Sequence, residues 1–590
     1  MLTIKNQNSF VPLLKVFAIV FSLIFSLPSF ANSTATYKLE IKGIKNTAIL
    51  DNAKIYTKMI VPAEMDGSER NKILVKRAIE RAVSVFGYYD TQITFQIHPS
   101  KKDQKITKII ANVKLGKPSR ISGISTEFVG DAAQDPEFQL LKQQTPKIGS
   151  IVLQKSYDDY KGKISQLALE RGYFDGDFTL SRLEVSPQTY QAWWKLVFNS
   201  GVRYKFGKFH FVNNQIRDDY LKNVMPMAPD EPYLMSQLSQ LNSEYTRSGW
   251  FSSVLFQPKV DKQKKVVNMD IFFIPRKKNQ FNVGIGYSTD VGMRYRLGWK
   301  RPWINSRGHS LGANIYVSKP KKAFGATYKM PLLKNPLKYY YDFGLGIEKE
   351  KENDTDTTAG LFSALRYWNK PTGWQYAFGV RSRYDSFTQG NQSHNTTLIY
   401  PTLSFNRTRF RGGLFPYWGD TQQIAFDYGN KHLFSDVGFF KIKATSIWIR
   451  SYLKNHRVVF RGELGYLNAK EFERIPPSLR FFAGGDRSVR GYGYKKISPT
   501  DKQGKLVGGS RLANLSLEYQ YQVYPKWWLA TFFDSGLAAD TYHKENLHYG
   551  TGVGLRWVSP VGAIKLDVAR PVNDKNTHNI QIYLGLGSDL

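Results

Sequence analysis

The pattern of apolar and polar residues changes near residue 279, and from there to residue 590 the two kinds alternate along short segments. Alternation is the period of a β-strand, whose side chains point to opposite faces in turn. One face here is apolar and aromatic and the other is glycine-rich and charged, which is typical of a barrel with lipid outside and a polar lumen. A soluble β-sandwich also alternates, but its apolar face would not be so narrow a band of aromatic residues. The clearest segments are 281–287, 341–348, 514–521 and 549–557.

The length of this region predicts the size of the barrel. Residues 279–590 number 312, and a membrane strand with its share of turn or loop takes roughly 20 residues. Closure into a barrel also removes the unpaired strand edges that lipid does not tolerate. The fold class expected for this region is a transmembrane antiparallel β-barrel of about 16 strands, since bacterial barrels have even numbers.

Upstream of residue 279, a segment with helical periodicity followed by Gly-aromatic-aromatic occurs three times. The glycines are 85 and 77 residues apart, a domain-sized repeat. A glycine is expected there because the end of a helix often needs a left-handed residue. The helical segments and their glycines are Ile73–Phe86 with Gly87, Tyr160–Arg171 with Gly172, and Leu238–Ser248 with Gly249.

Each repeat is predicted to be a small α+β unit with the order strand, helix, helix, strand, strand. The first helix is expected to bury Leu74, Ala78, Ile79, Ala82 and Val85, and the second Ile164, Leu167 and Ala168. The strands expected around the helices are Thr91–Ile97, Ile106–Leu115, Leu196–Phe198, Lys208–Val212 and Val266–Ile274. The predicted domains are 32–117, 118–201, 202–275 and the barrel 279–590.

Residues 1–31 are predicted to be a secretory signal peptide. Lys5 and Lys15 precede the apolar core Val16–Leu27, which leads to a Ser29-Phe30-Ala31 cleavage site. The alternative, an anchor helix, needs ~20 apolar residues and this core is shorter. The chain has no cysteine, so packing and strand pairing alone must hold the fold.

The net charge of +35 is large. Nucleic acid would be the first partner considered for a cytoplasmic chain, but the export signal and the lack of a nucleic-acid motif argue against it. Anionic lipid head groups or acidic client segments are the favoured partners of this charge. The alternative is that many surface lysines only aid solubility.

The strongest local signal is the segment 480–492, which ends in Val-Arg490-Gly491-Tyr492 and lies between two predicted strands. Arg490 carries a planar guanidinium group able to make paired hydrogen bonds to a carboxylate in a confined lumen. Asp534 lies on the lumen side if Phe533 faces lipid. The alternative is that Arg490 is an exposed loop arginine and Asp534 a structural turn residue.

Two glycine motifs accompany that segment. Gly536 completes a Phe-x-Asp-x-Gly sequence, and Gly552 and Gly554 form Gly-x-Gly on a later strand. Glycine removes the side chain, so Gly552 and Gly554 are expected to let a folded-in loop approach the barrel wall.

These motifs resemble those of the outer-membrane protein insertases and two-partner secretion transporters, and the three repeats resemble POTRA domains. Within that superfamily the layout is similar to the TamA family, the outer-membrane subunits of translocation and assembly modules. Segments 171–175, 286–292 and 328–336 and the loop motif in 480–492 resemble that family, and the last two are far more specific than the superfamily motifs. BamA-type insertases differ in having five POTRA domains, and two-partner transporters have two behind a plug helix. The alternative from a different functional class is a passive porin. The three repeats argue against it, because a pore does not need them.

The resemblance implies a protein of the bacterial outer membrane with its POTRA arm in the periplasm. It would assist the insertion or secretion of β-rich proteins such as autotransporters. The implied partners are a large inner-membrane-anchored periplasmic subunit (TamB-like), unfolded β-barrel clients and outer-membrane lipids. The alternatives are a two-partner-secretion-type transporter and a component of phospholipid transport.

No enzyme, cofactor or metal site is indicated. Gly308–Gly312 fits the hydrolase pattern Gly-x-Ser-x-Gly, but that chemistry needs a strand–turn–helix elbow and the next residues continue as an alternating strand. The nine histidines show no metal-ligand spacing.

The first and last barrel strands are expected to pair weakly and to form a lateral seam. Both place two glycines on the lumen face, and glycine adds no cross-strand packing. The alternative is that these glycines only make room for the loop. The predicted seam residues are Val283, Gly284, Ile285 and Gly286 on one side, and Ile582, Leu584, Gly585 and Gly587 on the other.

Overall fold

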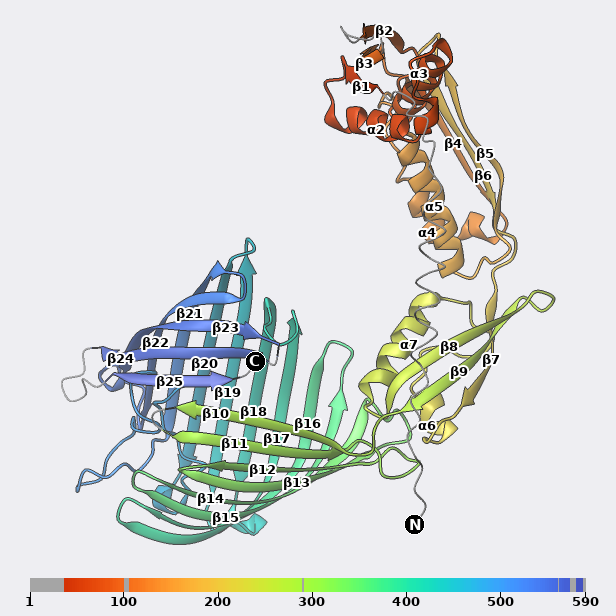
Figure 1. The fold of residues 1–590 in the computed structure, drawn as a ribbon. Helices are drawn as coiled ribbons and strands as arrows, with labels where there is room; N and C mark the ends of the chain where they lie inside the picture. The colour runs from red at the N-terminus through yellow and green to blue at the C-terminus, as the bar shows by residue number, and fades with distance from the viewer. Residues whose placement is uncertain (1–36, 100–105, 289–290, 561, 573–579, 587–590) are drawn as a thin grey trace, which may run out of the picture. The chain divides into compact units, whose positions relative to one another are not determined.

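The computed structural model describes residues 37–99, 106–288, 291–560, 562–572 and 580–586. The predicted signal peptide, residues 1–31, lies outside these ranges. The described residues form two compact units: one holds two α+β repeats, and the other holds a third repeat and a closed β-barrel (Figure 1). None of the helices in the described ranges is long and apolar enough to cross a membrane.

The first repeat has the predicted order of elements. They are β1 (Lys38–Lys42), α2 (Thr47–Lys58), the 3-10 turn η1 (Pro62–Glu64), α3 (Glu69–Ser84), β2 (Gln92–Pro99) and β3 (Ile106–Lys114). The sheet order is β1-β3-β2, with β1 parallel and β2 antiparallel to β3. Asn46 and Ser68 begin α2 and α3 because their side chains accept hydrogen bonds from amides of the first turn.

The buried face of α3 differs in part from the predicted one. Ile79 and Ala82 are buried as expected, but Leu74, Ala78 and Val85 are only partly buried. Val75 and Val83, on the same side of the helix as Ile79, fill the core instead. The prediction chose the row of residues next to the buried one, because both rows are apolar and only the packing against α2 and the sheet selects between them.

The second repeat is built in the same way. It contains β4 (Arg120–Val129), the 3-10 turn η2 (Asp131–Gln134), α4 (Pro136–Lys142), α5 (Gln154–Glu170), β5 (Asp177–Ser186) and β6 (Gln191–Asn199), with sheet order β4-β6-β5. Of the residues predicted for the buried face, Ile164 and Ala168 are in the core and Leu167 is packed against it. Phe138, Tyr160 and Trp194 complete this core.

Asp135 joins two parts of the second repeat. Its side chain caps α4 by accepting from the amide of Glu137 at 3.1 Å. Its other carboxylate oxygen accepts from Arg171 Nε at 2.6 Å and from the Tyr173 hydroxyl at 2.9 Å. Burial raises the pKa of Asp135, but these hydrogen bonds outweigh burial and hold the pKa below its usual value.

The third repeat contains β7 (Lys205–Val212), α6 (Asp218–Lys222), α7 (Met235–Arg247), β8 (Phe251–Asp261) and β9 (Val266–Pro275), with sheet order β7-β9-β8. The expectation for the repeated glycines is confirmed in all three repeats. Gly87, Gly172 and Gly249 have φ angles of 91°, 84° and 80°, the left-handed backbone that ends a helix.

The barrel has the predicted sixteen strands, β10 to β25, each paired with the next and β10 paired with β25 (Figure 1). The strands are β10 (Gln280–Ser288), β11 (Gly292–Arg301), β12 (Ser310–Ser318), β13 (Lys321–Pro331), β14 (Tyr339–Glu352), β15 (Thr355–Asn369), β16 (Trp374–Gln389), β17 (Gln392–Arg411), β18 (Trp418–Gly429), β19 (Phe439–Tyr452), β20 (His456–Ala469), β21 (Arg511–Tyr524), β22 (Trp527–Ala539), β23 (His548–Ser559), β24 (Gly562–Val572) and β25 (Gln581–Leu586). Three 3-10 turns, η3 (Lys431–Leu433), η4 (Phe472–Arg474) and η5 (Lys544–Asn546), lie in the connections.

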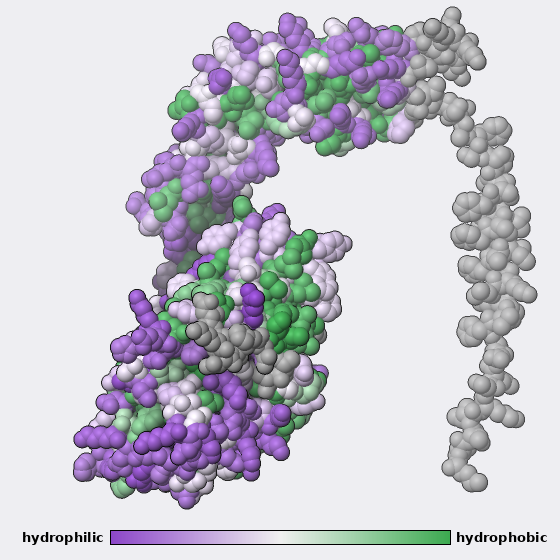
Figure 2. Space-filling model, turned by 90° about the vertical axis from the view of Figure 1, so that its left-hand side faces the viewer, coloured by the Kyte–Doolittle hydropathy of each residue, from purple (hydrophilic) through white to green (hydrophobic). Residues whose placement is uncertain are grey.

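The predicted alternation is seen in the exposure of the strands. Val283 is 73% exposed and Leu345 63%, whereas Asp534 and Gln520 are fully buried. Apolar residues therefore cover the outer wall and polar ones line the lumen. Figure 2 shows green hydrophobic areas and purple hydrophilic areas on one face of the molecule. β10 begins shortly after β9 ends, so the strand ends on that side are called the repeat end of the barrel.

The Gly-x-Ser-x-Gly segment is part of the junction between the third repeat and the barrel. Ser310 begins β12, as the alternation predicted. The Trp250 indole Nε1 donates to the carbonyl oxygen of Gly308 at 3.0 Å. A Cβ on Gly308 would lie 2.5 Å from the indole ring, so glycine is required there for packing.

Candidate functional site: the lumenal loop and the barrel seam

The lumenal loop, residues 470–510, joins β20 to β21 and is held in a fixed shape by its own backbone. Short β-bridges link Phe481 to Gly509, Ala483 to Ile497, and Thr500 to Leu506. Val489 and Tyr492 of the loop are buried in one apolar cluster with Leu398 and Tyr400 of the barrel wall. The loop therefore packs inside the barrel.

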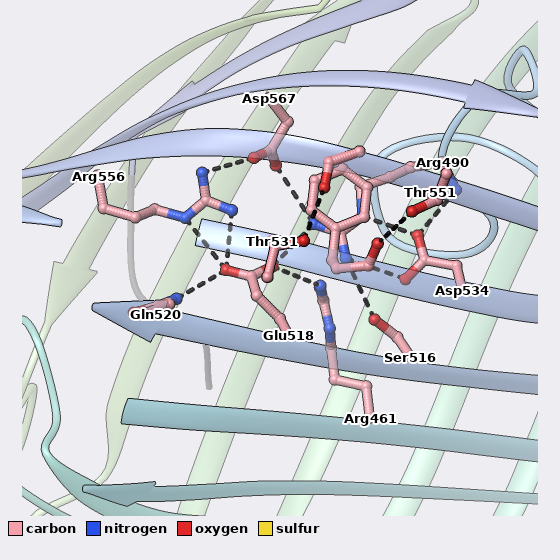
Figure 3. Close-up of polar contacts among 12 residues, drawn as sticks. Arg461, Arg490, Ser516, Glu518, Gln520, Thr531, Asp534, Thr551, Arg556 and Asp567 are labelled. Atoms are coloured by element: carbon pink, nitrogen blue, oxygen red, sulfur yellow. Dashed lines mark hydrogen bonds and ion pairs between the residues drawn. The ribbon is translucent and has the colours of Figure 1, made fainter. Parts of the chain in front are cut away.

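Arg490 anchors this loop to the wall (Figure 3). It is 1% exposed. Its Nε and Nη2 donate to the two oxygens of Asp534 at 2.8 and 2.9 Å, and its backbone amide donates to the same carboxylate at 3.0 Å. The guanidinium carbon lies 3.3 Å from the ring centroid of Phe532. The structure thus brings Arg490 and Asp534 together in the paired geometry that the motif suggested.

Further charged residues extend the anchor. Arg490 Nη1 lies 2.8 Å from Glu518 and 3.4 Å from Asp567. Arg556 lies 2.8 Å from Glu518 and 2.5 Å from Asp567, and Arg461 lies 3.8 Å from Glu518 (Figure 3). Three guanidinium groups therefore face three carboxylates. Charge balance of this kind limits the cost of burying charges.

The described part of the seam between the first and last strands is short. Within the described residues two register pairs join β10 to β25, Tyr287 with Leu584 and Ser288 with Tyr583. By comparison, nine pairs join β10 to β11 and six join β24 to β25. Val283, Ile285, Ile582 and Leu584 are exposed on the outer face. Gly587 lies outside the described residues.

The seam glycines have different surroundings. A Cβ on Gly286 would lie 3.5 Å from Arg294 Nε, and one on Gly284 would lie 3.7 Å from Arg296 Cβ. At Gly585 a Cβ would meet nothing within 4 Å. These distances are ordinary van der Waals contacts, and none of the three glycines has the loop within 4 Å of its Cβ position. The alternative that these glycines only make room for the loop is therefore not supported at Gly284, Gly286 or Gly585.

The lumenal loop contacts both sides of the seam. On the β25 side, the Gly491 amide donates to the Tyr583 hydroxyl, which donates to the carbonyl oxygen of Tyr492, both at 3.1 Å. On the other side, Asp486 accepts from Arg294 of β11 at 3.1 Å. We call these contacts the seam clasp, because one loop holds strands on either side of the seam.

Models of known protein families match the barrel and two of the three repeats. Residues 277–590 match the Omp85 superfamily domain, which is more than half of the chain. The chain belongs to the Omp85 superfamily. Residues 38–112 match the model described as POTRA domain TamA domain 1, and residues 204–275 match a POTRA model described as surface antigen variable number repeat. The repeats are POTRA domains, here numbered 1 to 3, and precede a closed sixteen-strand barrel.

Two curated relatives are each named outer membrane protein assembly factor BamA. The one from Nitratidesulfovibrio vulgaris is 22% identical over 386 residues, 61% of this chain and 48% of that protein. The one from Neisseria meningitidis serogroup B is 22% identical over 572 residues, 84% of this chain and 70% of that protein. The first match thus spans about half of its relative.

A solved structure shares the fold. BamA from Haemophilus ducreyi lacking POTRA domains 1–3 has a TM-score of 0.65 at 17% identity, and the match covers 79% of this chain and 99% of that one.

One prediction about the Omp85 motifs is wrong. Gly552 and Gly554 do not receive the loop: Cβ atoms there would lie 2.2 Å from the Val568 carbonyl oxygen and 2.0 Å from Asp567 Oδ1, both on the neighbouring strand. The loop instead comes closest at Gly550, where a Cβ would lie 1.8 Å from the Arg490 carbonyl oxygen. Gly552 also leaves space for the Phe532 ring beneath Arg490.

Sequence reasoning missed Glu518, Arg556, Asp567 and Asp486. Glu518 and Arg556 occupy the polar positions of two alternating segments, so their lumenal side could be foreseen. Their proximity could not, since it depends on which strands pair and in which register. Within the described residues, no group of three or more His, Asp or Glu side chains is arranged to hold a metal ion.

Proposed function

We propose that this Omp85 protein is the outer-membrane subunit of a translocation and assembly module and helps β-rich proteins such as autotransporters to insert or to be secreted. Its barrel would lie in the bacterial outer membrane and its POTRA arm in the periplasm. The match of POTRA domain 1 to a TamA-type model supports the module, and the names of the relatives support an assembly role.

The observation that carries this proposal is the seam, in which the described residues form two register pairs, together with its clasp. An edge strand presents unpaired amides and carbonyls to a strand of matching direction. When the seam opens, a client strand pairs with the edge of β10 and enters the bilayer with its backbone hydrogen bonds satisfied. The loop that holds both seam sides then controls access to that edge.

The POTRA arm is the proposed docking site for the large periplasmic partner anchored in the inner membrane. Each POTRA sheet has three strands, and β2 is an edge strand of the first. A partner strand can add to such an edge. A chain lacking residues 36–117 is expected to insert normally but to lose co-purification with this partner. Retained co-purification would place the docking site elsewhere.

The function is tested with the purified full-length protein in liposomes and an unfolded autotransporter β-domain as client. We expect more protease-protected, folded client than in empty liposomes or in liposomes with a porin. Equal client assembly in all three would contradict the proposal. Transfer of labelled phospholipid between vesicles without client assembly would instead favour the phospholipid-transport alternative.

A further inference from the structure

The outer wall of the barrel carries an unusual group of charged and aromatic residues at the repeat end. We call it the arginine–tryptophan cluster. It is formed where β16 begins, β17 ends, β18 begins and β19 ends. Its members are Trp374, Arg407, Arg409, Arg411, Trp418, Asp420, Trp448 and Arg450.

Strand register places this cluster on the outside of the barrel. The even-numbered Leu398 and Tyr400 of β17 pack against the lumenal loop, so odd-numbered residues such as Arg409 face outward. Arg409 is paired across the strands with Asp420, and Asp420 with Trp448, which is 40% exposed. The cluster is thus directed toward the membrane.

One carboxylate serves several arginines there. Asp420 is fully buried beneath them. Arg409 contacts it at 2.8 and 3.2 Å, Arg407 at 3.4 Å and Arg450 at 3.9 Å. With Arg411 included, four guanidinium groups and one carboxylate leave a formal excess of three positive charges.

Tryptophan rings hold the guanidinium groups in place. Arg407 lies over Trp374 at 5.1 Å, Arg411 over Trp418 at 5.3 Å, and Arg450 over Trp448 at 4.8 Å from the ring centroids. Arg407 Nε is buried and makes no hydrogen bond. The cluster therefore holds its guanidinium groups against aromatic rings and includes one donor, Arg407 Nε, that the protein leaves without an acceptor.

The position of the cluster in the membrane indicates which anion it would bind. Trp side chains at strand ends mark the level of the lipid head groups. An excess of positive charge at the head-group level attracts anions. Phosphate offers several acceptor oxygens that match the planar guanidinium fork.

We propose that the arginine–tryptophan cluster binds the phosphate of a lipid head group in the leaflet on the POTRA side of the membrane. This site is separate from the seam; it rests on the membrane placement given with the proposed function but not on client assembly. A bound lipid would neutralise the cluster and fix the barrel's depth in the bilayer at this wall.

The test is native mass spectrometry of the full-length protein released from micelles that contain dioleoylphosphatidylglycerol. The double variant Arg407→Gln/Arg409→Gln is expected to retain this lipid about tenfold less well, because two charge-assisted contacts are lost. Arg366→Gln is the matched control. Arg366 lies at the same end over Tyr341 and Trp368, at 5.7 and 5.0 Å, outside the cluster, and its loss should change retention less than about twofold.

A second variant keeps the test valid if the double variant fails to fold. Arg411→Gln leaves the ion pairs of Asp420 intact and should lower lipid retention about threefold. Wild-type retention by both cluster variants, or an equal loss in Arg366→Gln, would overturn the proposal. Retention of dioleoylglycerol, which has no phosphate, as tightly as of the phospholipid would also overturn it. So would displacement of the lipid by 10 mM inorganic phosphate, which would identify a soluble-phosphate site.

Discussion

The carboxylate of Asp486 in the lumenal loop lies 3.1 Å from the guanidinium group of Arg294 on β11. Six residues later in the chain, the same loop is hydrogen-bonded to Tyr583 on β25. The two ends of the barrel sheet are therefore joined by a loop as well as by the two register pairs that the described residues form. These side contacts help to hold the seam closed.

Loss of the Asp486–Arg294 pair is predicted to loosen the seam. Both groups are partly exposed to the lumen, so Asp486→Asn should cost at most about 1 kcal/mol of barrel stability. Opening of the seam should nevertheless become more frequent, measured as faster labelling of a single cysteine placed at Tyr287. Asp486→Asn and Arg294→Gln together should act no more strongly than either alone. Additive effects would show that the two residues do not act as a pair.

The loop anchor is predicted to carry much more stability than the clasp. Arg490→Ala leaves Asp534 buried without its donor and should destabilise the barrel by about 3–5 kcal/mol while still allowing insertion. The measurement is the temperature at which the folded band is lost in heat-modifiable electrophoresis. Arg490→Met/Asp534→Asn should recover part of this loss, because no uncompensated charge remains. An Arg490→Ala protein with wild-type heat stability and client assembly would contradict the anchor.

Acid is predicted to weaken POTRA domain 2. Arg171, Tyr173 and the Glu137 amide stabilise the ionised form of Asp135, and its pKa is lower in the folded than in the unfolded domain. The stability that Asp135 contributes is therefore fully present above the unfolded pKa of about 4 and is lost as pH falls through the folded value.

Hydrogen exchange of peptides from residues 120–199 in the full-length protein measures this effect. Rates are normalised to those of the unfolded peptides at each pH. Protection should fall on acidification in the wild type. In the Asp135→Asn variant, the free energy of unfolding of POTRA domain 2 should be about 1–3 kcal/mol lower at neutral pH. Its protection should also lack the fall on acidification that Asp135 causes in the wild type. The same acid dependence in both proteins would assign it to other groups.

The sequence predicted the architecture well because the architecture follows from periodicity. Alternation marked the barrel region, and its length gave the sixteen strands that are observed. The repeated glycines marked helix ends because few residues adopt their left-handed backbone. Which apolar row of α3 is buried was misjudged, since Leu74 and Val75 are equally apolar and only tertiary packing separates them.

The candidate site was predicted less completely. Arg490 and Asp534 could be paired because each lies in a recognisable motif. Glu518 and Asp567 could be assigned only to the lumenal side, since alternation gives the face of a strand but not the neighbour across the lumen. The Asp486–Arg294 contact depends on the path of a loop without periodicity, and no pattern in the sequence reports that path.

The most direct test of the seam mechanism is a reversible disulfide across it. The chain has no cysteine, and Tyr287 on β10 is paired with Leu584 on β25. A disulfide bond in the double variant Tyr287→Cys/Leu584→Cys would hold β10 and β25 together and keep the seam closed. Leu566→Cys/Leu584→Cys is the matched control, since Leu566 is paired with Leu584 on the other side of β25. This control pair joins β24 to β25 and leaves the seam able to open.

Client assembly in liposomes is then compared before and after oxidation, with the extent of cross-linking measured in each sample. Our account predicts that the oxidised seam pair loses client assembly, that reductant restores it, and that the oxidised control pair stays active. Full activity of a seam pair shown to be completely cross-linked would contradict lateral opening.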